Sequence, residues 1–175
     1  MANYTAADIK ALREKTGAGM LDVKKALDEA NGDQQKAAEI IRVKGLKGIT
    51  KREGRATAEG LVAARVENGV GYMIEVNSET DFVAKNEKFI DFANTVLAAA
   101  IESGATSAEE LAKVEVDGQS VQALTDGMQA VIGEKIVVRR LARLSGEVVS
   151  LYLHRTNPDL PAQVGVLVST DKAAE

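Results

Sequence analysis

The strongest constraint on the fold lies between residues 70 and 86, where a strand-like run passes through a polar turn into a helix-like run. Residues 70–76 are rich in β-branched and aromatic side chains, as expected for a half-buried strand. Polar residues from Asn77 to Thr80 interrupt the run. Beyond them, apolar residues recur with the spacing of an amphipathic helix. They are Phe82, Phe89, Phe92, Val96 and Ala99 or Ala100.

Phe82 differs from the other members of this series because it lies in the turn itself. A large aromatic residue beside Asp81 either anchors the turn in the protein's own core or is presented to a partner. Because phenylalanine is usually buried, the residue type alone favours the anchor.

The segments around this stretch predict an α+β fold. Residues 61–66 and 70–76 read as two strands joined by an Asn-Gly turn, the commonest signal for a short hairpin. A capping signal begins a short helix at Ser107, residues 121–133 have one apolar side, and residues 136–144 return to a strand pattern. This order predicts an antiparallel sheet with helices on one face.

Three short helices are predicted over residues 1–45. Thr5 followed by Asp8 is a capping signal for the first, Asn31 and Gly32 end the second, and the third is expected to end at Gly45. One small apolar face on each helix predicts a compact three-helix module. Residues 46–59 are a basic, glycine-containing linker; such charge runs are mostly solvated, and contact with an acidic partner surface is the alternative.

The last part of the chain begins a second unit of the same kind. Gly165-Val-Leu-Val can be aligned with Gly71-Tyr-Met-Ile, each followed by a polar turn. We therefore expect a first α+β subdomain over residues 60–144 and an incomplete second subdomain over residues 145–175. Without its helices, the second hairpin has an apolar face that is exposed or covered by something else, which permits self-association.

The composition of the chain excludes several classes of function. With 22 basic and 26 acidic residues the net charge is -4, so the chain has no general attraction for nucleic-acid backbones. It contains no cysteine, which excludes disulfide and thiolate chemistry, and a single histidine, which excludes a histidine-based metal cluster. No apolar segment is long enough to span a bilayer. We expect a cytoplasmic protein without cofactor, metal or membrane partner.

The best candidates for catalysis are Glu75, Glu79, Asp81 and His154. Carboxylates at positions 75 and 79 could flank a site, and His154 could be a base near neutral pH. However, the sequence contains no phosphate-binding loop, paired histidines or nucleophile motif that would order them. We therefore expect no covalent catalysis.

Several motifs in register resemble bacterial elongation factor Ts, the guanine nucleotide exchange factor of elongation factor Tu. They are Thr-Asp-Phe-Val-Ala-Lys at residues 80–85 preceded by Glu-Val-Asn at 75–77, Leu-Arg-Glu-Lys-Thr-Gly-Ala-Gly-Met at 12–20, Asp-Val-Lys-Lys-Ala-Leu at 22–27, and Ile-Gly-Glu at 132–134. The resemblance covers essentially the whole chain. It implies a ubiquitin-associated-like helical module followed by two related core subdomains, of which this chain resembles the front part.

The resemblance also implies which residues contact GDP-bound elongation factor Tu. They are Arg13, Met20, Leu21, Asp81, Phe82, Ile132, Gly133 and His154. In this scheme Phe82 is a wedge beside the magnesium site of the GTPase and Asp81 orients the turn. Leu21 stands where some relatives have a second methionine. His154, from the second subdomain, is otherwise an ordinary residue at the end of a hairpin.

Two other functions stay open on the sequence. The chain is either an exchange factor or a fragment that docks on elongation factor Tu without effective exchange, because members of this family continue beyond residue 175. A helical adaptor for peptides or ubiquitin-like folds is the third possibility, and it rests on the first three helices alone.

Overall fold

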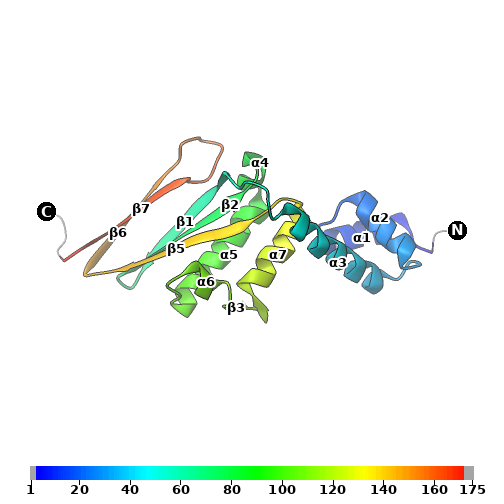
Figure 1. Ribbon diagram of the computed structural model, residues 1–175, viewed down its shortest axis with the longest axis horizontal. Helices are drawn as coiled ribbons and strands as arrows, with labels where there is room; N and C mark the ends of the chain where they lie inside the picture. Colours follow the sequence, from blue (N-terminus) through cyan, green and yellow to red (C-terminus); the bar gives the residue numbers. More distant parts are fainter. Residues whose placement is uncertain (1–2, 172–175) are drawn as a thin grey trace. The chain divides into compact units, whose positions relative to one another are not determined.

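The structure is a computed structural model that describes residues 3–171 (Figure 1). It divides into two compact units. The first comprises Met1–Gly54 and Asp126–Lys135, and the second comprises Arg55–Thr125 and Ile136–Glu175. The chain leaves and re-enters each unit.

The first unit begins with three helices, α1 (Ala6–Thr16), α2 (Met20–Glu29) and α3 (Gln34–Arg52), as predicted. The expected capping box begins α1: the Asp8 amide donates to Thr5 Oγ1 at 3.2 Å, and the Thr5 amide donates to the Asp8 carboxylate at 2.7 Å. Six buried side chains hold the three helices together. They are Leu12, Val23, Ala26, Leu27, Ala30 and Ala37.

Helix α3 is longer than the sequence predicted. The expected end at Gly45 is wrong, because α3 continues to Arg52 and includes residues 46–52 of the predicted linker. Gly45 has a packing role instead: a Cβ atom there would lie 2.5 Å from Cβ of Ala130, in the last part of α7 (Val121–Ile132). The missing side chain lets the two helices approach closely.

The second unit is built on an antiparallel sheet of β1 (Glu59–Glu67), β2 (Val70–Ser78) and β5 (Val137–Ser145), in the order β1-β2-β5. The predicted hairpin is confirmed. Asn68 and Gly69 both have positive φ angles, 51° and 74°, as the short turns that match strand twist require.

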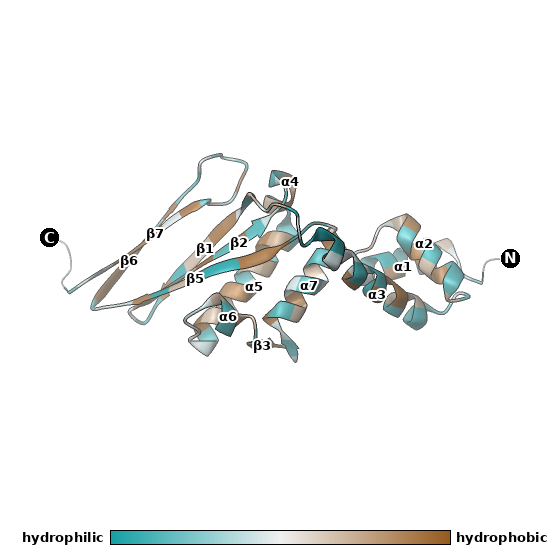
Figure 2. Cartoon of the chain, viewed as in Figure 1, coloured by the Kyte–Doolittle hydropathy of each residue, from teal (hydrophilic) through white to brown (hydrophobic). Residues whose placement is uncertain are grey.

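Helices cover one face of this sheet: α4 (Asp81–Ala84), α5 (Glu87–Ser103) and α6 (Ala108–Leu111), with α5 running beneath β1 and β2 (Figures 1 and 2). The predicted apolar face of α5 is confirmed, and its buried side chains meet those of the sheet. The core includes Leu61, Ile74, Val76, Phe89, Phe92, Val96, Ala99 and Ala100.

A small hairpin of β3 (Glu115–Val116) and β4 (Gln119–Ser120) precedes α7 and was not predicted. Its turn residues Asp117 and Gly118 have positive φ angles, so an Asp-Gly turn signal was present in the sequence. The strands are too short to show the alternation from which a hairpin is predicted.

The predicted second hairpin is β6 (Val148–His154) and β7 (Val164–Thr170), and it packs on the sheet face opposite α5. A Cβ atom at Gly71 would lie 2.9 Å from side-chain atoms of both Val149 and Leu167, so the glycine allows close layering. The other face of the hairpin is exposed, including Tyr152, Val164, Val166 and Val168. None of the helices within residues 3–171 combines the length and apolarity needed to cross a membrane.

Candidate partner-binding site

The turn between β2 and α4 is anchored at both ends. At its start the buried Ser78 hydroxyl donates to the Thr80 carbonyl at 3.0 Å. Thr80 then caps α4, accepting from the Val83 amide at 3.4 Å. Val83 and Ala84 are buried. The turn is therefore held in one conformation rather than left as a loose loop.

A polar network lies under this turn. Asn77 is only 8% exposed; its Nδ2 donates to the Glu59 carbonyl at 3.2 Å, and its Oδ1 accepts from Arg139 Nε at 2.5 Å. Arg139 Nη2 also donates to Thr57 Oγ1 at 2.7 Å. Strands β1, β2 and β5 are thus joined directly below the turn. The motif included Asn77, but nothing in the sequence related it to Arg139.

The side of the turn carries an ion pair between Glu79 and Arg55, with Oε2 and Nη1 3.2 Å apart. The Glu79 side chain is 18% exposed, so this carboxylate is partly shielded from water. Its guanidinium partner is half exposed, so the pair orients the turn more than it stabilises the fold.

Phe82 is 73% exposed, so the prediction that it anchors the turn in the core is wrong. The reason is that Val83 and Ala84 occupy the inward positions of the one-turn helix, which leaves position 82 facing outward. Nζ of Lys85 lies 4.7 Å from the ring centroid. Asp81, at the first position of α4, is exposed beside it.

In the first unit, the loop between α1 and α2 exposes a second apolar surface. Met20 is 61% exposed and Leu21 is 72% exposed, at the start of α2. Gly17, with a φ angle of 69°, ends α1, and its amide donates to the Arg13 carbonyl at 2.7 Å. Arg13 is also exposed, on the last turn of α1.

The end of α7 lies against this same loop. A Cβ atom on Gly17 would lie 2.5 Å from Cγ1 of Val131. Ile132 follows, half-buried, and Gly133 is exposed with a φ angle of 83°. The fold thus brings the loop and the helix end together although more than a hundred residues separate them in the chain. Helical periodicity could not reveal this contact.

His154 ends β6, apart from both groups in the topology, and its Nδ1 lies 3.0 Å from the Tyr152 hydroxyl. Two of the three acids considered for catalysis are engaged in ion pairs: Glu75 Oε2 accepts from Arg140 Nε at 2.5 Å, and Glu79 pairs with Arg55. The third, Asp81, is exposed. Within the described residues no three His, Cys, Asp or Glu side chains are grouped to hold a metal ion.

Comparison with known proteins identifies the family. The profile described as Elongation factor TS matches residues 79–175. Elongation factor Ts of Pseudarthrobacter chlorophenolicus is 67% identical over 175 residues, which are all of this chain and 63% of that protein. The Kocuria rhizophila protein of the same name is 66% identical over 173 residues, 99% of this chain and 63% of the relative.

A third relative, Elongation factor Ts of Micrococcus luteus, is 65% identical over 171 residues, 98% of this chain and 62% of that protein. The chain spans about 63% of the length of the first of these curated relatives. The match of the family profile to more than half of the residues is decisive, and the chain belongs to the elongation factor Ts family.

Proposed function

We propose that this chain acts in translation elongation as a guanine nucleotide exchange factor, binding GDP-bound elongation factor Tu and promoting GDP release. The observation that carries this proposal is the exposure of Phe82, at 73%, on a turn whose neighbours are buried and hydrogen-bonded. A large aromatic side chain held outward in a fixed position is the kind of residue that dominates protein interfaces.

In the proposed mechanism, Phe82 enters the nucleotide-binding domain of elongation factor Tu beside its magnesium site. The Asp81 carboxylate orients the turn against that surface. Displacement of the groups that hold magnesium and phosphate weakens GDP binding. By linkage, bound GDP lowers the affinity of the GTPase for this chain to the same extent, so GDP and the chain oppose each other's binding.

Phe82 does not act alone. One aromatic hot spot contributes about 2 kcal/mol or more at an interface, whereas each tenfold increase in release rate requires about 1.4 kcal/mol. The first unit supplies further contact through Arg13, Met20 and Leu21. The proximity of Gly17 and Val131 supports the inclusion of Ile132 and Gly133 in the same surface.

His154 is proposed as a separate contact with the GTPase, made from the end of β6. Its position on an exposed hairpin strand, with the Tyr152 hydroxyl 3.0 Å from Nδ1, is compatible with this role. The contact would add affinity and not act on the nucleotide.

One observation favours a second candidate, a fragment that binds without effective exchange. The sequence spans 63% of the length of these two relatives, so the share of their contacts with a partner that lies within it is what the experiment below measures. The exposed valines of β7, Val164, Val166 and Val168, offer an apolar surface for binding that does not involve the Phe82 turn.

The release rate of fluorescent GDP from elongation factor Tu, measured with increasing concentrations of this chain, separates the two candidates. Saturable acceleration is expected for an exchange factor. Release at the intrinsic rate, together with recovery of the complex in a pull-down, would assign the chain to binding alone. Failure of both measurements would exclude elongation factor Tu as the partner.

A further inference from the structure

Strand β1 has one free edge. The order β1-β2-β5 leaves one side of β1 without a neighbouring strand. On that side the Val62 amide donates to the Ala162 carbonyl at 2.8 Å, which shows that the backbone of Val62 points away from β2. Backbone groups alternate along a strand, so those of Ala64 and Val66 also point outward. Among residues 3–171, no other backbone hydrogen bond reaches this edge from outside the sheet.

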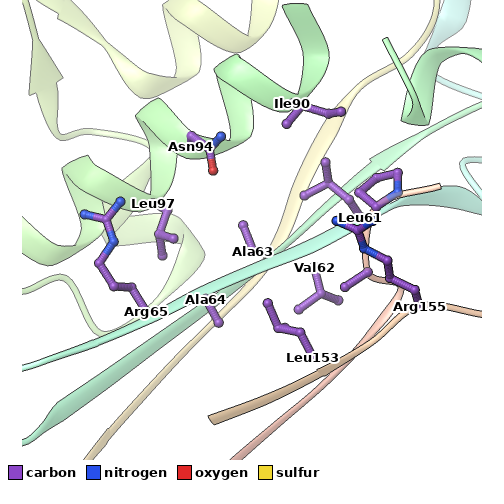
Figure 3. A pocket seen from close by; sticks show the side chains of 12 residues that line it. Leu61, Val62, Ala63, Ala64, Arg65, Ile90, Asn94, Leu97, Leu153 and Arg155 are labelled. Carbon is purple, nitrogen blue, oxygen red and sulfur yellow. The ribbon is translucent and has the colours of Figure 1, made fainter. Parts of the chain in front are cut away.

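A cavity of about 320 Å³ lies along this edge, with a wall on each side (Figure 3). Helix α5 contributes Ile90, Asn94 and Leu97, and the hairpin contributes Leu153 and Arg155. Figure 3 shows Asn94 and Leu97 facing the strand from the helix side and Leu153 from the hairpin side. Pro161 and Ala162 close the groove beside Val62. We call this feature, lined by residues 61–65 of β1, the five side chains from α5 and the hairpin, and residues 161–162, the β1-edge groove.

The charges in the β1-edge groove are positive and lie at its two ends. Arg65 and Arg155 stand at opposite ends in Figure 3, with apolar side chains between them. Arg65 forms an ion pair with Glu67, with Nη1 and Oε1 3.2 Å apart, and its side chain is half exposed. Arg155 is exposed and has no ion-pair partner in the part of the chain that the structure describes. In a chain of net charge -4, the positive charge at the Arg155 end of the groove favours an acidic ligand group there, and that of Arg65 is partly offset by Glu67.

We propose that the β1-edge groove docks an extended segment of a partner protein that has an apolar centre and acidic ends. The segment would add as a further strand beside β1, pairing with the outward amide and carbonyl of Ala64. Its carboxylates would meet Arg65 and Arg155, and its apolar side chains would lie against Leu97 and Leu153. Because the Ala162 carbonyl already accepts from the Val62 amide, the segment would pair with the edge from Ala63 to Val66, about four residues at about 3.3 Å per residue.

This surface contains none of the residues proposed to act on the nucleotide, although Leu153 and Arg155 flank His154, the separate contact proposed with the GTPase. It contains neither Phe82 nor any residue of the first unit. Occupation of the groove would therefore tether a further protein to the chain, and it can be tested without elongation factor Tu.

The test is fluorescence anisotropy of the whole chain with a labelled peptide, Asp-Val-Thr-Val-Asp, blocked at both ends. One control peptide has lysine in place of both aspartates, and the other is N-methylated at alternate amides. Each control should bind about tenfold more weakly, because the first loses the ion pairs and the second loses the strand hydrogen bonds. Absence of binding by the aspartate peptide would overturn the proposal, as would equal binding by either control.

Variants locate the peptide on the chain. Arg155→Glu should weaken binding about tenfold, whereas Lys113→Glu, an equal charge change at an exposed site outside the groove, should leave it unchanged. Ala64→Pro removes one outward amide without removing a bond of the sheet, and it should weaken binding while the circular dichroism spectrum is retained. Equal binding by Arg155→Glu would overturn the assignment. A third outcome would also overturn it: the chain self-associates, Arg155→Glu abolishes that self-association, and no peptide binds. The occupant of the groove would then be a second copy of this chain.

Discussion

The ammonium nitrogen of Lys85 lies 4.7 Å from the centroid of the Phe82 ring, although Phe82 itself is 73% exposed. An exposed cation–π contact contributes about 0.5–1 kcal/mol, enough to favour one orientation of the ring without burying it. The buried neighbours Val83 and Ala84 fix the backbone from below. The ring is therefore held in one orientation on the surface.

Phe82→Ala should lower the acceleration of GDP release about tenfold or more, because one interface hot spot contributes about 2 kcal/mol. The free energy of unfolding should change by no more than about 0.5 kcal/mol, since the ring is mostly in water. GDP release and urea denaturation, measured on the same preparation, check both values. Phe89→Ala is the matched control: Phe89 is 0% exposed, and its truncation should cost about 3–5 kcal/mol of stability. A similar loss of stability in the two variants would make Phe82 a structural residue.

Asn77→Ala should destabilise the fold by about 1–3 kcal/mol, because the Glu59 carbonyl and the Arg139 guanidinium each lose a hydrogen-bond partner. The maximal rate of GDP release should also fall although Asn77 is only 8% exposed, since the turn above it loses its support. The exposed Asn157→Ala, in the loop between β6 and β7, serves as control. If maximal exchange is unchanged at temperatures where the variant is folded, Asn77 does not position the turn.

Gly45→Ala should destabilise the first unit by about 1–3 kcal/mol despite the better helix propensity of alanine. The added Cβ would lie 2.5 Å from Cβ of Ala130, and the helices would have to separate. Ala130→Gly in the same chain should restore the space, giving a favourable coupling of about 0.5–3 kcal/mol in a double-mutant cycle followed by thermal unfolding.

Gly127→Ala is the control for that cycle. A Cβ atom at Gly127 would have no neighbour within 4 Å, so this substitution should stabilise α7 by about 0.5–1 kcal/mol. If the changes in the free energy of unfolding caused by Gly45→Ala and Ala130→Gly are additive, the stability of the first unit does not depend on the close approach of α3 and α7.

The pKa of Asp8 lies below its ordinary value of 3.8, first because the Thr5 amide donates to the carboxylate and next because the Thr5 hydroxyl does so. A lowered pKa in the folded state means that the ionised group stabilises the fold above pH 3.8 and that this contribution is lost as the pH falls through the folded value. Asp8→Ala should therefore be less stable than the parent chain at pH 7. The difference should shrink steadily in urea titrations carried out from pH 5 down to about pH 2. A difference that does not depend on pH would exclude the charged capping box as its source.

Local signals predicted much of the fold. The Asn68-Gly69 turn, the Thr5–Asp8 capping box and the spacing of Phe89, Phe92 and Val96 each act within a few residues, and each prediction is confirmed. The motif around Asp81 also led to the turn that presents the most exposed aromatic side chain.

The same signals failed at two residues whose type fits more than one position in a fold. Gly45 resembled a helix end, since glycine is common there, but it sits inside α3 opposite Ala130. Phe82 continued the spacing of the buried face of α5, yet α4 turns it outward. For Gly45 the deciding neighbour, Ala130, lies in another helix, and for Phe82 it is the packing of Val83 and Ala84 in the core that decides the outcome.

By itself the sequence determined most of the helices and the longer strands, because caps, turns and apolar periodicity depend on residues close together in the chain. The short hairpin of β3 and β4 and the end of α3 were the exceptions. Only the tertiary structure decided that Gly17 meets Val131, that Asn77 meets Arg139, and that the edge of β1 lies open between α5 and the second hairpin. These relationships depend on packing between segments far apart in the sequence. Many pairings of such segments are possible, and side-chain volumes and hydrogen-bond partners select one of them only when the chain folds.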